Sequence, residues 1–399
     1  MTPVDPTEKN VLQHENNRIS AYFYELLARL GATQTADKTV AVCVAHMVPN
    51  SIHFLPALNR VVPIALLLPK PKSAQENSIQ EIAKLGLREH ELSRLWAAEA
   101  ENLIDELVVA GYDGYSLVFI DIGGYFAPSL SNFVDRWSGT VLGVLEGTEN
   151  GALAYEKQFG DQSPPVPVAT VARSPLKLPE DHLVGASIVF SVEALLREHG
   201  QILQTRVACI IGFGKVGRAV ASALRGRGIP TVVHDNMPVP RAEAAAQGYQ
   251  VYLRLQDALA VASLVISATS NNVMNKLALA DVRKGTAIAS VTSRDSEFVE
   301  KDLDEGYERQ PLDPEDHIVR YDEKRSDRYF WLVNDGNAPN FVHGAVIGPA
   351  IQLIEGEKLA AVRALIAGDL PSGVGRGPLR ELSEKQRERV ADVWNSHFI

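Results

Sequence analysis

Residues 206–235 read RVACIIGFGKVGRAVASALRGRGIPTVVHD, and this stretch predicts the fold of the chain around it. Residues 207–211 form a short, β-branched apolar run of the kind found in buried parallel strands. A glycine-rich turn follows, and apolar residues then recur at helical spacing as far as Leu224. A second strand, residues 230–234, ends at Asp235. Strand, glycine turn, helix and strand in this order predict a dinucleotide-binding unit.

Each glycine of the turn GFGKVG has a physical role in such a unit. Gly212 permits the tight turn, Gly214 lets the backbone approach a pyrophosphate, and Gly217 lets the helix pack against the sheet. Asp235 would bind the ribose hydroxyls and repel a 2′-phosphate, which favours NAD over NADP. The alternative is an ordinary strand–turn–helix that binds nothing. The predicted cofactor-binding residues here are Gly212, Phe213, Gly214, Lys215, Val216, Gly217 and Asp235.

The composition limits the class of protein. The 399 residues are enough for two domains, and the formal net charge of −10 disfavours nucleic acids and anionic membranes as partners. A polar N-terminus and short apolar runs predict neither a signal peptide nor a membrane span. Cys43 and Cys209 each lie in an apolar, strand-like run, so we expect reduced core thiols and no metal site. These features favour a cytoplasmic protein with a small-molecule substrate.

Strand-like and helix-like segments alternate on both sides of the glycine turn. The predicted strands are residues 39–45, 61–69, 116–121, 140–146 and 166–171 before it, and 250–252, 264–269, 286–291 and 329–333 after it. Long helices are predicted over residues 92–110 and 343–367. This alternation predicts an α/β fold with mostly parallel sheets and helices on both faces.

Residues 177–248 contain Lys177 and Asp181 four positions apart, then GFGKVGRA and then AAAQGYQV. Over this stretch the sequence resembles the adenosylhomocysteinase (S-adenosylhomocysteine hydrolase) family, in which these segments correspond to a substrate-contacting lysine and aspartate, to GYGDVGKG and to AAMEGYEV. Weaker similarity extends to both sides, for example at His46-Met47 and at LEGTENG, residues 145–151. The resemblance covers most of the chain, but only the middle third is specific.

The resemblance implies a Rossmann NAD-binding domain inserted in a doubly wound, parallel-sheet substrate domain, with the active site in the cleft. Residues 1–184 would begin the substrate domain, residues 185–345 would bind NAD, and residues 346–399 would be helices that return to the substrate domain. In the family, tightly held NAD oxidises a nucleoside 3′-hydroxyl, after which thiol elimination, water addition and ketone reduction follow. A homo-oligomer, a dimer or a tetramer, is also implied.

The resemblance and the strand ends give three candidates for proton transfer and substrate binding. Lys177 would handle the proton of the oxidised hydroxyl and Asp181 would bind the sugar, unless the two are a solvated pair beside a proline turn. His46 follows the carboxyl end of a predicted strand, where open parallel sheets bind ligands. Its imidazole suits acid–base work near neutrality. The alternative for His46 is a capped surface histidine.

Two carboxylates and three polar residues complete the candidate site. Asp121 ends a strand where the family has two adjacent carboxylates, the second of which is Ile122 here. Glu146 is the better of two glutamates in LEGTENG; Glu149 is the alternative, and either could be a helix N-cap acid. Further cofactor contacts are expected from Thr269 and Asn271 after a strand, where a simple turn is the alternative, and from Asn340, which resembles an asparagine near the nicotinamide.

The departures from the family fall mainly in the substrate site. Val48 and Asn50 stand where a threonine and a glutamate cradle adenine, and Ser293 stands where a histidine is expected. Ile347-Gly348-Pro349 stands where the family has a later G-H-P, and the nearby His343 is a candidate substitute for the missing histidine. We therefore predict oxidation of a different hydroxyl-bearing metabolite, either transient, with elimination or hydrolysis, or as net oxidoreduction. Authentic adenosylhomocysteinase and a non-catalytic NAD-binding regulatory protein are the alternatives.

Overall fold

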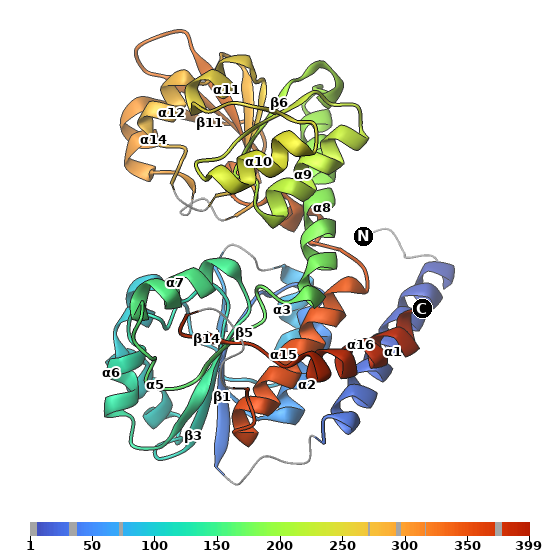
Figure 1. The fold of residues 1–399 in the computed structure, drawn as a ribbon, viewed down its shortest axis with the longest axis vertical. Coiled ribbons are helices and arrows are strands. Elements are labelled where there is room, and N and C mark those ends of the chain that lie inside the picture. The colour runs from blue at the N-terminus through green and yellow to red at the C-terminus, as the bar shows by residue number, and fades with distance from the viewer. Residues whose placement is uncertain are drawn as a thin grey trace. The chain divides into compact units, whose positions relative to one another are not determined.

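The computed structural model describes residues 6–31, 38–71, 75–269, 272–292, 297–315, 317–371 and 377–399. The chain divides into two compact units (Figure 1). Unit 1 contains the residues up to Lys177 together with Gly348–Ile399, and unit 2 is the continuous segment Leu178–Ile347. Unit 2 therefore interrupts the sequence of unit 1. Each unit is an α/β fold, as the alternation of strands and helices predicts.

Unit 1 is built on a six-stranded sheet in which every neighbouring pair is parallel. Its strand order is β14-β5-β4-β3-β1-β2. The strands are β1 (Thr39–Ala45), β2 (Ile64–Pro69), β3 (Ser116–Asp121), β4 (Val141–Glu146), β5 (Val168–Thr170) and β14 (Leu379–Arg380). Every residue of β1 is buried, as in a strand covered on both faces. The order reverses between β1 and β3, which is where doubly wound sheets bind ligands.

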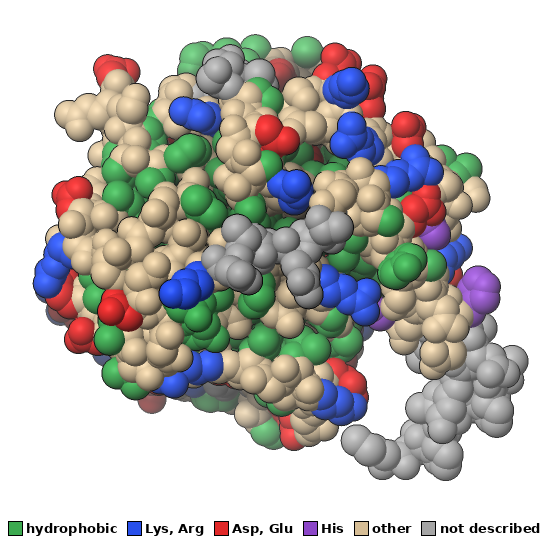
Figure 2. All heavy atoms as spheres, turned by 90° about the horizontal axis from the view of Figure 1, so that it is seen from below, with side chains coloured by type: hydrophobic (Ala, Val, Ile, Leu, Met, Phe, Trp, Pro, Cys, Tyr) green, Lys and Arg blue, Asp and Glu red, His purple; other side chains and the backbone are tan. Residues whose placement is uncertain are grey.

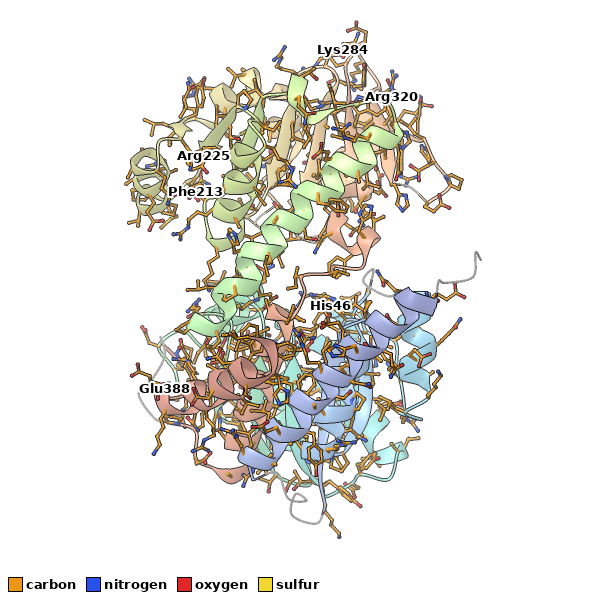
Figure 3. The ribbon with its side chains drawn as sticks, turned by 90° about the vertical axis from the view of Figure 1, so that its right-hand side faces the viewer. His46, Phe213, Arg225, Lys284, Arg320 and Glu388 are labelled. Atoms are coloured by element: carbon orange, nitrogen blue, oxygen red, sulfur yellow. The ribbon has the colours of Figure 1, made fainter. Side chains whose placement is uncertain are left out.

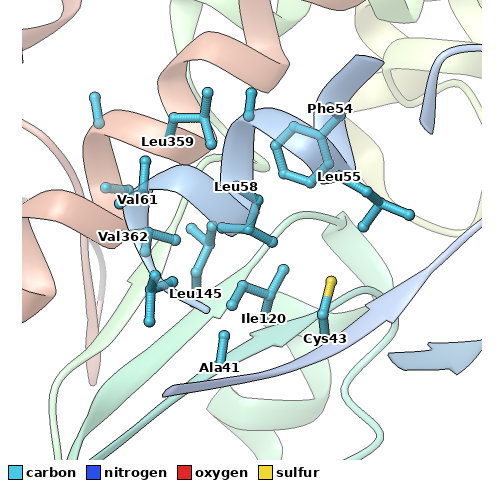
Figure 4. Packing of buried hydrophobic residues seen from close by; sticks show 14 of the residues in the cluster. Ala41, Cys43, Phe54, Leu55, Leu58, Val61, Ile120, Leu145, Leu359 and Val362 are labelled. Atoms are coloured by element: carbon cyan, nitrogen blue, oxygen red, sulfur yellow. The ribbon is translucent and has the colours of Figure 1, made fainter. Parts of the chain in front are cut away.

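Helices cover both faces of this sheet (Figure 1). One layer contains α1 (Pro6–Arg29), α2 (Ser51–Val61), α15 (Ala350–Ala367) and α16 (Glu384–Phe398), and α3 (Glu76–Ala83) packs against α2. The other contains α4 (Arg94–Ala98), α5 (Ala100–Val109), α6 (Leu130–Arg136) and α7 (Glu149–Phe159). Ala41 and Cys43 of β1 pack in the first layer (Figure 4), whereas Val40 and Val42 pack in the second. The period-two alternation of a strand thus supplies both cores.

Two of the predicted helices are wrong in extent. Residues 92–110 form two helices, because Glu99 between them has extended backbone angles (φ −103°, ψ 108°). Residues 343–367 contain a long helix only from Ala350, because Gly344 adopts a left-handed conformation (φ 78°) and Pro349 precedes the helix. Apolar periodicity continues through both breaks, so it does not reveal them.

Unit 2 contains an eight-stranded sheet of order β11-β12-β13-β10-β9-β6-β7-β8. The parallel strands are β6 (Ala208–Ile211), β7 (Thr231–His234), β8 (Gln250–Val251), β9 (Leu264–Ser267), β10 (Thr286–Ser290) and β13 (Tyr329–Val333). Their order in the sheet is that of dinucleotide-binding folds, with the reversal between β6 and β9. This confirms the predicted Rossmann architecture. Two antiparallel strands that we did not predict, β11 (Tyr307–Pro311) and β12 (Ile318–Glu323), extend the sheet.

Helices also cover both faces of the unit 2 sheet. They are α8 (Leu178–Glu198), α9 (Lys215–Gly226) and α10 (Pro238–Ala246) on one core, and α11 (Leu255–Val261), α12 (Lys276–Asp281) and α14 (Glu300–Gly306) on the other. Cys209 lies in β6 and, like Cys43, is buried and free, as predicted. Burial raises the pKa of both thiols to about 12, so neither is reactive near neutrality. Among the described helices, none has the length and hydropathy to span a membrane.

Candidate active site

The loops after β6 and β9 meet where the strand order of unit 2 reverses. Gly212 has φ 91°, and a Cβ there would lie 2.8 Å from the carbonyl oxygen of Ala268. A Cβ on Gly217 would lie 2.0 Å from the carbonyl oxygen of Gly212, so only glycine fits at either position. A Cβ on Gly214 would instead meet nothing within 4 Å. The turn is thus closed on the sheet side and open at Gly214, where a pyrophosphate would approach.

Asp235 follows β7 beside the same turn. Its Oδ2 accepts a hydrogen bond from the Phe213 N–H at 2.7 Å, and its Oδ1 accepts one from the Met237 N–H at 2.7 Å. The residue is half-buried, and each carboxylate oxygen keeps acceptor capacity for a ribose hydroxyl. Phe213 itself is fully buried beside α9 (Figure 3), so it contributes its backbone rather than its ring.

Lys215 and Val216 form the first turn of α9, whose N–H groups and positive dipole end suit a phosphate. Lys215 Nζ lies 4.0 Å from Oδ2 of Asp181, which is buried in the first turn of α8. The structure therefore brings a predicted cofactor residue and a predicted catalytic residue together. Lys177 ends the 3-10 turn η1 (Pro175–Lys177), the last element of unit 1 before α8.

The predicted nicotinamide end of the site contains a buried glutamate that we did not predict. Glu297 is fully buried and accepts hydrogen bonds from Ser267 Oγ at 2.5 Å and from both the N–H and Oγ1 of Thr269, at 3.0 and 2.9 Å. It also accepts one from Thr292 Oγ1 at 3.1 Å. Thr269 therefore fixes the loop after β9, because its donors bind Glu297. Asn271 lies outside the described residues.

Asn340 gives a test of whether this end fits a nicotinamide. Its side chain is 5% exposed, and its Oδ1 accepts no hydrogen bond from the described residues. Buried amide oxygens in proteins nearly always have a partner, and the amide group of a nicotinamide would supply one. Nearby, His343 shares a hydrogen bond between Nδ1 and Ser191 Oγ at 2.9 Å, which orients its ring. The residues present thus fit the cofactor.

In unit 1 the carboxyl ends of β3 and β4 bring Asp121 and Glu146 together. Both are fully buried. Asp121 accepts hydrogen bonds from the N–H groups of Tyr125 and Phe126, each at 3.1 Å, and from the Tyr155 hydroxyl at 2.9 Å. This arrangement fixes the loop that follows β3 against α7.

Glu146 fixes the same loop from the neighbouring strand. It accepts hydrogen bonds from the Gly124 N–H at 2.9 Å and from the Thr148 N–H and Oγ1 at 2.6 and 2.7 Å. Burial, and then the charge of Asp121, raises the pKa of Glu146 to about 8, and burial also raises the pKa of Asp121. At neutral pH Glu146 is therefore largely protonated. Glu149, the alternative to Glu146, instead forms an ion pair with Arg173 at 2.7 Å.

His46 lies directly after β1, on the other side of the reversal in strand order (Figure 3). Its carbonyl oxygen accepts a hydrogen bond from Ser51 Oγ at 2.6 Å, which ties the loop to the start of α2. Burial lowers the pKa of the imidazole well below its ordinary value, and the positive charges of Lys70 and Lys358 lower it further. A neutral imidazole at neutral pH can accept a proton.

Comparison with known proteins supports the geometry of unit 2. Residues 187–338 match the family described as S-adenosyl-L-homocysteine hydrolase, NAD binding domain. This segment is therefore similar to the NAD-binding domain of the adenosylhomocysteinase family. An adenosylhomocysteinase of Sulfolobus acidocaldarius is 23% identical over 317 residues, which cover 79% of this chain and 71% of that protein.

Solved structures give weaker likenesses. A protein from Thermus thermophilus has a TM-score of 0.43 and 14% identity, over 82% of this chain and 97% of that chain. A phosphoglycerate oxidoreductase from Vibrio cholerae has a TM-score of 0.39 and 14% identity, over 65% of this chain and 76% of that chain. Scores this low add nothing to the strand order described above.

Several residues of the candidate site were not predicted from the sequence. Lys70 had a usable signal, because it directly follows β2 just as His46 follows β1. Tyr155 and Glu297 had none, since a helical tyrosine or a loop glutamate is ordinary until its partners are known. Lys358 likewise reaches this edge of unit 1 from α15, far away in the sequence.

Proposed function

We propose that this chain is an NAD-dependent enzyme that oxidises a hydroxyl of a small metabolite other than S-adenosylhomocysteine. The match of residues 187–338 to the NAD-binding domain of the adenosylhomocysteinase family and the geometry of the glycine turn support NAD as the cofactor. When bound, NAD supplies the oxidising group for a carbon that bears a hydroxyl. The oxidation is either transient, with elimination or hydrolysis at the neighbouring carbon, or net.

The single observation that most supports a substrate other than S-adenosylhomocysteine is the presence of Val48. This side chain is 6% exposed in the loop after β1, and it has no donor or acceptor where the family has a polar contact to adenine. Asn50 forms no side-chain cap hydrogen bond at the start of α2. A site that hydrogen-bonds its substrate rejects analogues strongly, and loss of the polar partner removes that preference.

The proposed roles follow from the chemistry of each side chain. Lys177 would accept the proton of the reacting hydroxyl at Nζ, and Asp181 would accept a hydrogen bond from a substrate hydroxyl. His46 would be a second proton acceptor because its imidazole is neutral. Asp121 and Glu146 would hold the loops after β3 and β4 in place, since their oxygens bind loop N–H groups.

The test has three parts: the nucleotide released on denaturation, the release of homocysteine, and the reduction of bound NAD by hydroxyl metabolites. Denaturing the purified protein should release NAD, whose redox state is then recorded; an enzyme that regenerates its cofactor within each cycle retains it. Release of homocysteine from S-adenosylhomocysteine at saturating NAD should be slower than in an adenosylhomocysteinase by a factor of about 10³ or more. An ordinary rate of homocysteine release would overturn the proposal and identify an authentic adenosylhomocysteinase. Failure of every hydroxyl metabolite to reduce bound NAD would favour the regulatory alternative.

A further inference from the structure

Three cationic side chains lie around the carboxyl ends of the unit 1 strands. Lys70 follows β2, Arg94 begins α4, and Lys358 lies on α15. We propose that Lys70, Arg94 and Lys358 form an anion-binding subsite beside His46, which binds a carboxylate or phosphate group of the substrate. This inference rests on the proposed function, because it names the chemical class of the hydroxyl metabolite. The subsite lies where the strand order reverses, which is the ligand-binding edge of open parallel sheets.

Gly123, in the loop after β3, brings two of these cations together. A Cβ on Gly123 would lie 3.5 Å from Lys70 Nζ and 3.5 Å from Arg94 Nη2, so the two nitrogens are within twice that distance of each other. Gly123 has φ 112°, a conformation that favours glycine. The space that a side chain would occupy is therefore bordered by an ammonium and a guanidinium group.

Arg94 is held in place before any ligand arrives. Its Nη1 donates a hydrogen bond to the Gly123 carbonyl oxygen at 2.7 Å, and its guanidinium carbon lies 4.0 Å from the centre of the Tyr125 ring. These contacts leave Nη2 beside the space at Gly123. A planar guanidinium that is fixed in this way binds carboxylate and phosphate oxygens with little loss of side-chain entropy.

Lys358 borders the same edge from α15. A Cβ on Gly147 would lie 3.2 Å from Lys358 Cε and 3.1 Å from Ile122 Cγ2, which places the lysine over the loops after β3 and β4. Lys358 and Lys70 both lie close enough to His46 to lower its pKa. Both ammonium groups are therefore near the imidazole. An anion bound by these lysines would lie near a proton acceptor.

Two buried carboxyl groups, Asp121 and Glu146, also lie at this edge. Asp121 is close enough to Arg94 for that charge to lower its pKa, but its oxygens are bound by loop N–H groups and by Tyr155. Glu146, with a pKa of about 8, is largely protonated at neutral pH. The edge is thus locally positive in a chain of formal net charge −10. On the face of the molecule in Figure 2, by contrast, Lys and Arg are interspersed with Asp and Glu.

Two exposed acids are also near. Glu89 and Glu91 line a shallow surface depression together with Lys70. Glu89 and Glu91 are exposed, so water and salt screen their charges, whereas Lys70 is half-buried and is screened less. Adenine is neutral and would gain little from three cations. The cations, together with the apolar Val48, therefore favour an oxyanion group over a nucleobase.

The test uses inorganic phosphate and acetate as probes of the full-length protein. The NMR signals of the His46 ring protons are assigned as those that are absent from the spectrum of His46→Gln. Their chemical shifts are then followed as each anion is added. We expect a saturable shift with at least one anion, and an affinity about tenfold lower in Lys70→Gln and in Lys358→Gln. Lys358→Arg should retain binding. Lys84→Gln, on an exposed lysine paired with Glu81, is the matched control and should not change it.

The stronger of the two anions identifies the group that the substrate carries. Absence of a saturable shift with either anion, or equal affinities in wild type and both Lys→Gln variants, would overturn the subsite. NAD is titrated into the same samples. If NAD binds and neither anion does, only the subsite is wrong. If an anion binds and NAD does not, the subsite stands and the proposed function fails.

Discussion

At the scale of single residues, we propose that Asp235 discriminates between NAD and NADP. Asp235→Ala should weaken NAD binding about tenfold and narrow the preference over NADP, because the carboxylate no longer faces the ribose. The variant also releases the Phe213 N–H that Asp235 binds at 2.7 Å, which loosens the turn. Titration of both nucleotides measures the change, with Asp257→Ala on the exposed side of α11 as the control. Unchanged affinity and preference would refute the assignment.

Glu146 makes the stability of the protein depend on pH. Its pKa is raised from 4.5 to about 8, so the folded state binds more protons than the unfolded state between these values. The stabilisation from the protonated carboxyl is complete below pH 4.5, and it is lost as the pH rises towards 8. The free energy of unfolding should fall by up to about 1.4 kcal/mol per pH unit in this window.

Glu146→Gln should flatten that dependence, because an amide does not titrate. Urea denaturation at several pH values between 5 and 8 measures the slope in both proteins. The comparison uses the slope rather than the absolute stability, since the amide nitrogen cannot accept the N–H bonds that Glu146 accepts. Equal slopes in wild type and variant would show that Glu146 ionises in the folded state at its ordinary pKa.

Substitutions of Lys177 test whether this protein is an enzyme or a regulatory NAD-binding protein. Lys177→Met should abolish reduction of bound NAD by the substrate, and Lys177→Arg should fail as well, since a guanidinium does not accept a proton near neutrality. NAD affinity should stay within about twofold of wild type in both variants. Absorbance of bound NADH after addition of hydroxyl metabolites is the readout. Full reduction without the lysine would exclude it as the proton acceptor.

The candidate-site residues that could be predicted from the sequence differ physically from those that could not. His46, Asp121 and Glu146 each end a buried strand, and the edge of a parallel sheet brings strand ends together whatever the rest of the chain does. Arg94 and Lys358 reach that edge through tertiary packing, which no local pattern encodes. The burial that raises the pKa of Glu146 is likewise a property of the folded interior.

At the scale of elements, the contact between α8 and α9 has no room for a side chain at Gly185. A Cβ there would lie 2.4 Å from the Cβ of Ala219. Gly185→Ala should therefore destabilise unit 2 by about 1–3 kcal/mol, through separation of the two helices. Gly226→Ala, at the end of α9 with nothing within 4 Å of the new Cβ, is the matched control. It should be neutral or slightly stabilising. Chemical denaturation measures both, and equal effects would contradict the close packing.

The strands that could be predicted are those whose sequence is a continuous apolar run. The β-branched runs of β1, β3, β6 and β9 are buried on both faces, so hydrophobicity alone identifies them. The strand β11 (YERQP) is exposed beyond its first residue and carries no apolar alternation. Its pairing with β12 depends on the neighbouring strand, which is why the sequence alone did not predict it.

At the scale of the whole molecule, the two units differ in what they need to fold. The cores of unit 2 contain residues of that unit alone, whereas the core that includes Cys43 also requires Leu359, Val362 and Val390 from the end of the chain. A fragment of residues 178–347 should fold and bind NAD with an affinity within about tenfold of the full chain. A fragment of residues 1–177 should not fold cooperatively. Circular dichroism and NAD titration of the two fragments test this, and a stable, cooperative 1–177 would contradict it.

The insertion of unit 2 also has a consequence for synthesis on the ribosome. The first strand of unit 1 is made early, but α15 and α16, which cover its sheet, are the last helices to emerge. At bacterial or eukaryotic elongation rates the apolar strands wait for roughly ten seconds or more while the inserted unit is translated and folds. During that interval only α1 and α2 of this layer are available to cover that face of the sheet, so part of it stays exposed. We therefore expect chaperones to bind the N-terminal half of the nascent chain, as a consequence of this order of elements along the sequence.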